Sequence, residues 1–180
     1  MKYVLIVIIS TVALFLAIGL FTSKSFSVEK EVEIALNETA VFDYLKRLKN
    51  QDEYSVWSSM DSNMVKEYIG KDATVGFISK WESSIKEVGK GELEIISISE
   101  KSKNSKNKIV LEIRFLEPFQ SKYKAFLSTD SVALNKTKVT WGFKGSMEYP
   151  SNLFLLFIDM EHVLGPDLQQ GLSNLKQELE

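Results

Sequence analysis

The sequence opens with an uncharged, apolar run that covers the nineteen residues 3–21. A helix rises about 1.5 Å per residue, so this run spans roughly 28 Å, which is close to the thickness of the hydrocarbon core of a bilayer. The run also lacks the polar stripe of a helix that packs onto a protein core. We therefore expect an uncleaved membrane anchor over residues 1–23 and one separate domain over residues 24–180.

A cleaved signal peptide is the main alternative for this first segment, and a buried core helix is the other. Lys2 supplies a basic start, but residues 17–19 (Ala-Ile-Gly) are a weak cleavage site and the apolar run is longer than a usual signal core. Lys24 and Lys30 follow the run, so charge sets its orientation only weakly. The two-residue head favours a single-pass protein with its domain on the extracytoplasmic side.

The composition excludes several classes of function. The chain has 22 Lys and Arg residues against 24 Asp and Glu residues, so it lacks the basic surplus of nucleic-acid-binding domains, and we expect no nucleic-acid partner. It has one histidine and no cysteine, which leaves neither the usual ligands of a zinc site nor a Cys–His nucleophile pair. We expect no metal ion or cofactor.

Hydrophobic periodicity predicts the order strand, helix, six strands, long helix. Alternation over residues 25–36 predicts the first strand, and the apolar face of Val41, Leu45 and Leu48 predicts a helix with Asn37 near its start. Residues 50–62 are interpreted as a loop with room for one short helix. Further strands are expected at 64–69, 75–82, 89–99, 109–116, 119–129 and 138–147, and their short connections indicate antiparallel pairing.

Leucines at helical spacing from Leu164 to Leu179 predict a long terminal helix that opens after Pro150. Gly165 and Pro166 interrupt this pattern. Because proline removes one backbone hydrogen bond of a helix, we expect a kink or a break there.

Several local motifs sharpen this outline: Val-Phe-Asp-Tyr at 41–44, Tyr-Ser-Val-Trp at 54–57, Val-Gly-Phe-Ile-Ser-Lys-Trp at 75–81 and Gly-Pro-Asp-Leu at 165–168. With the element order, they resemble the helix-grip fold of the START and Bet v 1-like superfamily, in its SRPBCC or polyketide cyclase/dehydrase-like branch. The family often opens its first helix with Pro-Pro or Ser-Pro, where this chain has Asn37-Glu-Thr.

The resemblance covers residues 25–180 and implies an α+β fold. A curved antiparallel sheet of about seven strands would wrap a long C-terminal helix and leave an apolar cavity between them, behind one transmembrane helix. This fold hosts many unrelated activities, so the resemblance does not identify a ligand.

Inward-facing aromatic residues give the strongest functional signal, because ligand pockets are mostly apolar with a few polar groups. The candidate cavity residues are Phe77, Ser79, Trp81, Phe115, Tyr123, Trp141, Phe143 and Phe157. Tyr149 is a further candidate for a polar group. A filled core without a usable cavity is the alternative, since aromatic side chains also fill cores.

No catalytic residue is assigned, because tyrosine is the only titratable group expected on the cavity face. His162 is interpreted as a surface residue, and Asp159 and Asp167 as helix-terminus carboxylates. Glu112 and Arg114 are interpreted as a surface cross-strand pair. The lysine-rich residues 101–108 form a solvated hairpin tip in this interpretation, and a patch for acidic lipid headgroups in the alternative.

Three hypotheses about function follow. The first is a membrane-tethered binding module for a hydrophobic small molecule, such as a lipid, an isoprenoid or a polyketide-like compound. The second is a polyketide cyclase or dehydrase-like enzyme that uses the same cavity. The third is a structural or stress-related anchored domain without a working pocket.

Overall fold

The computed structural model describes residues 1–102, 106–118 and 120–180. Its elements in chain order are α1 (Lys2–Phe21), β1 (Ser25–Ile34), α2 (Glu38–Lys46), η1 (Leu48–Asn50), α3 (Gln51–Tyr54), α4 (Val56–Ser59), β2 (Val65–Ile69), β3 (Ile78–Glu82), β4 (Lys90–Ser99), β5 (Asn107–Glu117), β6 (Ser121–Ala133), β7 (Lys136–Ser146), η2 (Ser151–Leu156) and α5 (Met160–Leu179). Part of the expected lysine-rich tip (103–105) and the expected start of one strand (119) lie outside the described residues.

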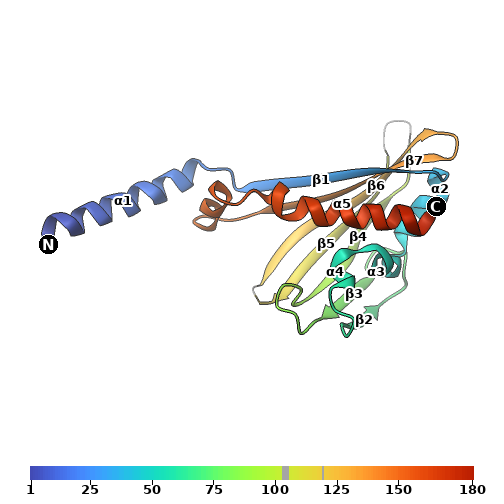
Figure 1. Cartoon of the computed structure of the whole chain (residues 1–180), viewed down its shortest axis with the longest axis horizontal. Helices are drawn as coiled ribbons and strands as arrows, with labels where there is room; N and C mark the ends of the chain where they lie inside the picture. Colours follow the sequence, from blue (N-terminus) through green and yellow to red (C-terminus); the bar gives the residue numbers. More distant parts are fainter. Residues whose placement is uncertain (103–105, 119) are drawn as a thin grey trace.

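Within the described residues, seven strands form one antiparallel sheet in the order β1-β7-β6-β5-β4-β3-β2. The first strand therefore pairs with the last, and α5 lies along one face of the sheet (Figure 1). Irregularities in the β4–β5 register near Gly91 and Ser97 bend the sheet, as bulges do. The predicted α+β helix-grip architecture is confirmed.

The register places the expected apolar positions on one face of the sheet. Phe143 lies opposite both Val28 and Ala125, and Ala125 lies opposite Leu111. All four side chains are buried, together with Leu168, Leu172 and Leu175 of α5. The core therefore lies between this face and α5, as the alternation along the strands predicts.

Helix α2 begins where the sequence predicts it. The Oδ1 atom of Asn37 accepts a hydrogen bond from the Ala40 N–H at 2.9 Å, which caps the helix, and Val41, Phe42 and Leu45 are buried. A side-chain cap of this kind satisfies one of the backbone donors that a helix start leaves unpaired.

Of the kink or break expected at Gly165-Pro166, the break does not occur. Helix α5 is continuous from Met160 to Leu179, with Pro166 inside it, and it begins at the Asp159 N-cap. Pro166 is tolerated because the carbonyl that loses its partner belongs to His162, which lies on the exposed side of the helix where water can bind it. The apolar residues before Asp159 form the separate turn η2.

The segment interpreted as a loop with one short helix contains η1, α3 and α4 instead. Tyr54 of this segment is buried, and its carbonyl accepts a hydrogen bond from the Asn174 side chain of α5 at 3.1 Å. The short helices are thus held against α5, and they cover one side of the space between α5 and the sheet (Figure 1).

Helix α1 extends away from the rest of the molecule (Figure 1). It is long and apolar enough to cross a membrane, and a signal sequence at an N-terminus has the same properties.

Candidate ligand cavity

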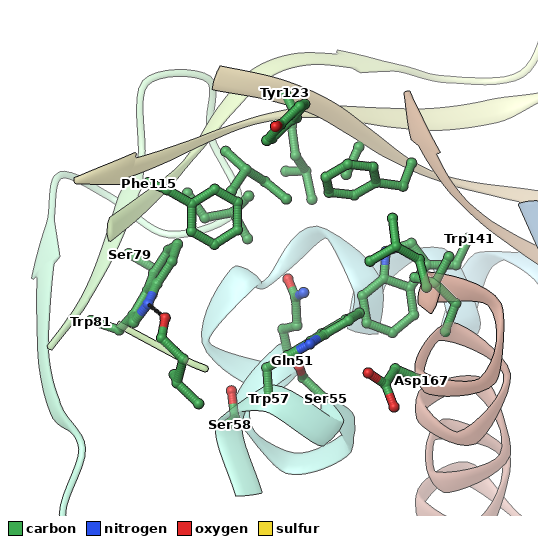
Figure 2. A pocket seen from close by; sticks show the side chains of 18 of the residues that line it. Gln51, Ser55, Trp57, Ser58, Ser79, Trp81, Phe115, Tyr123, Trp141 and Asp167 are labelled. Carbon is green, nitrogen blue, oxygen red and sulfur yellow. Dashed lines mark hydrogen bonds between the residues drawn. The ribbon is translucent and has the colours of Figure 1, made fainter. Parts of the chain in front are cut away.

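A cavity of about 400 Å³ lies between the sheet, the short helices α3 and α4, and the N-terminal half of α5 (Figure 2). Its volume falls within the range of roughly 300–1,000 Å³ that is typical of small-molecule sites. Leu111 and Ala125 of the sheet and Leu168 of α5 contribute to its wall. The lining is mostly apolar, which is the chemistry of a site for a hydrophobic molecule.

Aromatic side chains from neighbouring strands form one end of the cavity. The ring centroid of Tyr123 lies 5.3 Å from that of Phe143, 6.1 Å from that of Phe115 and 6.0 Å from that of Phe26. Edge-to-face and tilted pairs at these distances stabilise one another beyond their buried area. This end of the cavity is therefore a preorganised aromatic surface.

Trp81 of β3 extends this surface. Its ring meets Phe115 edge-on at 5.8 Å, and its indole N–H donates a hydrogen bond to the Val88 carbonyl at 3.2 Å. Gly91 of the neighbouring strand leaves room for the indole, because a Cβ atom at that position would lie 2.5 Å from it. The hydrogen bond and the glycine together fix the orientation of this wall residue.

Trp141 of β7 forms the opposite wall with Trp57 of α4. The two rings meet edge-on at 6.0 Å, and Tyr54 meets Trp141 at 5.6 Å. Gly171 lets α5 approach this ring, since a Cβ atom there would lie 2.7 Å from the indole. Trp141 is only 3% exposed, so it supports the core as well as the cavity.

A polar cluster centred on Asp52 occupies the α3–α4 side of the cavity. The Asp52 carboxylate pairs with Lys66 at 2.7 Å and accepts hydrogen bonds from the hydroxyls of Ser58, at 3.3 Å, and Tyr68. Burial raises the pKa of Tyr68, and its hydrogen bond to Asp52 raises it further. Tyr68 is therefore a neutral donor at physiological pH, and Asp52 and Lys66 bring opposite charges to the edge of an apolar space.

Two further polar groups on the wall lack partners. The Oε1 atom of Gln51 is buried and accepts no hydrogen bond from the described residues. Asp167 extends from α5 toward the cavity (Figure 2), and no described residue donates to its carboxylate. Both groups are acceptors, so they suit a molecule that brings O–H or N–H donors.

Six of the eight residues predicted from the sequence lie on the cavity wall: Ser79, Trp81, Phe115, Tyr123, Trp141 and Phe143. Phe77 lies instead in the core, with its ring stacked on that of Tyr68 at 6.1 Å. Phe157 is 72% exposed and lies outside the cavity, because the chain turns at η2 before α5 begins. Tyr149 is also exposed and lies outside the cavity wall.

The expectation that tyrosine would be the only titratable group on the cavity face is wrong. Asp52, Lys66, Glu87 and Asp167 also line it. The interpretation of Asp167 as a helix-terminus carboxylate is wrong as well, because α5 is continuous and Asp167 lies inside it. One signal in the sequence could have located Asp167: it lies three residues after Leu164 and directly before Leu168, so a helical wheel places it on the apolar side of the helix. Asp52 could not be placed, because its position depends on how the 50–62 segment folds back onto the sheet.

The remaining candidates lie away from the cavity. Asp159 is the expected helix cap, since its carboxylate accepts the Glu161 N–H at 2.9 Å, and His162 is exposed. Arg114 binds Glu112 and two further glutamates, Glu92 and Glu94, on the outer face of the sheet at 2.6–2.7 Å. In the part of the chain that the structure describes, no three His, Asp or Glu side chains converge in the way that a metal ion requires.

Comparisons with known proteins bear on the fold alone. No protein-family model and no curated protein matches this sequence. Among solved structures, norcoclaurine synthase from Thalictrum flavum, in complex with dopamine and hydroxybenzaldehyde, matches with a TM-score of 0.62 at 11% identity, over 89% of this chain and 90% of that one. The ginseng major latex-like protein 151 from Panax ginseng matches with a TM-score of 0.60 at 11% identity, over 88% of this chain and 99% of that one.

A hypothetical protein from Helicobacter pylori matches in the same range, with a TM-score of 0.61 at 11% identity, over 86% of this chain and 88% of that one. Sequence identities this low show a shared fold and not a shared activity. The chain has the Bet v 1-like helix-grip fold.

Proposed function

We propose that this chain is a membrane-tethered module that binds one hydrophobic small molecule between the sheet and α5. The observation that carries the proposal is the mostly apolar cavity of about 400 Å³, lined on two sides by fixed aromatic rings. A volume near the lower end of the usual range of about 300–1,000 Å³ favours one compact molecule, such as an isoprenoid or polyketide-like compound, over a long two-chain lipid.

The polar groups on the wall narrow the ligand class. An acceptor buried without a partner costs on the order of 1–3 kcal/mol, and a ligand that donates a hydrogen bond to it removes this cost. The buried, unpartnered Gln51 Oε1 therefore favours an apolar molecule that carries a hydroxyl or amine group, and the Asp167 carboxylate on the same wall offers a second acceptor for such a group.

Helix α1 supplies the proposed tether. Its twenty residues are almost wholly apolar and exposed, which suits contact with lipid. A tether of this kind would hold the cavity beside the phase into which a hydrophobic ligand partitions.

Extraction and native mass spectrometry of the full-length chain, purified in detergent, test the proposal. We expect an apolar compound to co-purify, and an apolar fluorescent probe to compete for its site with little dependence on salt, because apolar burial drives binding. Ser79→Trp fills the cavity and should abolish probe uptake. Ser99→Trp places the same side chain on an exposed end of β4 and serves as the control.

A folded wild-type chain that takes up no probe would favour a structural domain over a binding module. Equal uptake by Ser79→Trp and the wild type would move the binding site away from this cavity. Uptake that disappears at high salt would favour a charged surface site.

An enzyme that uses the same cavity is the second candidate, and the Asp52–Lys66–Tyr68 cluster favours it. A carboxylate oriented by two hydroxyl donors and paired with an ammonium can move a proton when a substrate lies within hydrogen-bond reach. Norcoclaurine synthase has the same fold and is named as an enzyme, but a shared fold supports catalysis in this chain only by analogy. Turnover of the co-purified compound that is lost in Asp52→Asn, with binding retained, would establish this alternative.

A further inference from the structure

Residues 151–158 form an uncharged segment whose last six residues are apolar, and four of these six side chains lie on the surface. Phe154 is 60% exposed and Phe157 is 72% exposed, and Leu156 and Ile158 are also exposed. Apolar side chains gathered in this way mark an interaction site more often than scattered ones do. The segment comprises η2 and the two residues that lead to the Asp159 cap of α5.

The segment is fixed to the C-terminal end of α1. Buried Asn152 donates hydrogen bonds from Nδ2 to the carbonyls of Gly19, at 2.7 Å, and Thr22, at 3.2 Å. Gly19 packs against Leu153 so closely that a Cβ atom would lie 2.9 Å from its side chain. In Figure 1, the orange-brown turn of η2 accordingly lies beside the end of α1.

A ring contact sets how far the segment reaches along α1. Phe157 stacks on Phe15, with their centroids 5.9 Å apart. Phe15 lies six residues before Phe21, the last residue of the helix, which corresponds to about 9 Å along the helix axis. If α1 spans a bilayer and ends near its surface, Phe157 lies at the depth of roughly 5–10 Å that interfacial helices reach.

The charges around the segment do not favour an anionic partner, because both nearby lysines are paired and Asp159, the cap of α5, adds a negative charge. Lys24 pairs with Glu148 at 3.3 Å, and Lys30 pairs with Glu161. A shallow hollow between the end of α1, β1 and η2 shares Phe26 and Met160 with the wall of the ligand cavity. The apolar segment is therefore next to the membrane-proximal end of that cavity.

We propose that residues 151–158 insert into the bilayer alongside the end of α1 and form a second membrane contact. The contact turns the end of the cavity that Phe26 and Met160 line toward the lipid. This inference rests on the membrane tether of the proposed function. The partner is the apolar layer beneath the headgroups of a zwitterionic membrane, because the segment carries no charge and the residues around it have no surplus of positive charge.

Single-cysteine variants of the full-length chain test the inference, since the natural chain has no cysteine. An environment-sensitive fluorophore is attached to Phe157→Cys, to Val12→Cys in the middle of α1, or to Leu134→Cys in the β6–β7 turn, where Leu134 is 94% exposed. Each variant is reconstituted in phosphatidylcholine vesicles that contain a lipid-attached nitroxide quencher. We expect quenching at 157 within about twofold of that at 12, as an interfacial depth implies, and none at 134.

The other outcomes distinguish a failure of the membrane tether α1 from a failure of the second membrane contact at residues 151–158. Quenching at 12 but not at 157 overturns the second contact and leaves the tether intact. Loss of quenching at 12 overturns the tether and this inference with it. A label at 157 that is protected from aqueous iodide but not reached by the lipid quencher shows that a second protein copy covers the segment, which also overturns the inference.

Discussion

Replacing Gln51 with methionine is expected to stabilise the empty protein and to weaken its ligand binding. The side chain lines the cavity, and its Oε1 atom is buried without a hydrogen-bond partner among the described residues. Removing such an acceptor recovers part of a cost of about 1–3 kcal/mol. Because the rest of the side chain is only half-buried, we expect the lower end, a gain of about 1 kcal/mol in the free energy of unfolding.

A gain of about 1 kcal/mol raises the midpoint of thermal unfolding by about 2–4 °C in a chain of this size, which circular dichroism of the full-length protein in detergent resolves. Gln177→Met is the matched control: the residue is an exposed helical glutamine, and Gln and Met have similar helix propensities, so its effect should stay within about 0.5 kcal/mol. The affinity for a hydroxylated apolar ligand should fall in Gln51→Met alone. A lower midpoint in Gln51→Met would refute the reasoning, because it would mean that the amide already makes a favourable contact in the folded protein.

Three further predictions follow from the core, the buried tyrosines and the cavity wall. Trp141→Ala should lower the free energy of unfolding by about 3–5 kcal/mol in urea titrations, and half-buried Trp81→Ala by less; an equal loss would contradict the difference in their burial. Burial raises the pKa of Tyr44 to about 12 from an ordinary value of 10.0 and also raises that of Tyr68, so both stay protonated in the folded chain while they ionise when it unfolds. Stability should therefore be constant with respect to these groups below pH 10 and fall as the pH rises from about 10 to 12, and a Tyr44→Phe, Tyr68→Phe double variant should flatten this fall; an unchanged slope would count against buried neutral tyrosines. Met160→Trp should slow the uptake of an apolar probe from vesicles more than His162→Trp does, because His162 is exposed and lies outside the cavity wall; equal rates would argue against entry at the end of the cavity next to η2.

The sheet could be predicted from the sequence because its two faces meet different surroundings. On β7, the buried apolar residues Val139, Trp141 and Phe143 alternate with outward-facing residues that include Lys138 and Lys144, so a register shift of one residue would reverse the side chains that reach the core. The same alternation placed Trp81, Phe115, Trp141 and Phe143 on the wall that the structure shows. Phe77 is on the same side of the alternation as Ser79 and Trp81, but it directly precedes the first residue of β3. Its ring packs against Tyr68 instead of facing the cavity.

Two polar groups of the cavity, Gln51 and Asp52, could not be predicted, because they come from a segment without a regular period. Asp52 and Gln51 belong to a four-residue helix whose position is set by contacts far away in the sequence, such as the bond from Asn174 to the Tyr54 carbonyl. A short helix has little stability of its own, so tertiary packing and not local sequence decides where its side chains point.

The position of Phe157 shows that hydropathy alone does not distinguish a side chain buried in protein from one exposed to lipid. The hydropathy pattern predicts that the apolar residues before Asp159 belong to the terminal helix and that Phe157 faces the cavity, because such apolar runs are usually buried in protein. Transfer from water to an apolar environment is favourable whether that environment is protein or hydrocarbon, so the pattern is the same in both cases. Only the structure separates them: Leu153 is buried against the end of α1, while Phe154 and Phe157 remain exposed beside it. In a chain that opens with an apolar helix long enough to cross a bilayer, exposed apolar residues fixed to the end of that helix are as well explained by lipid as buried ones are by a core.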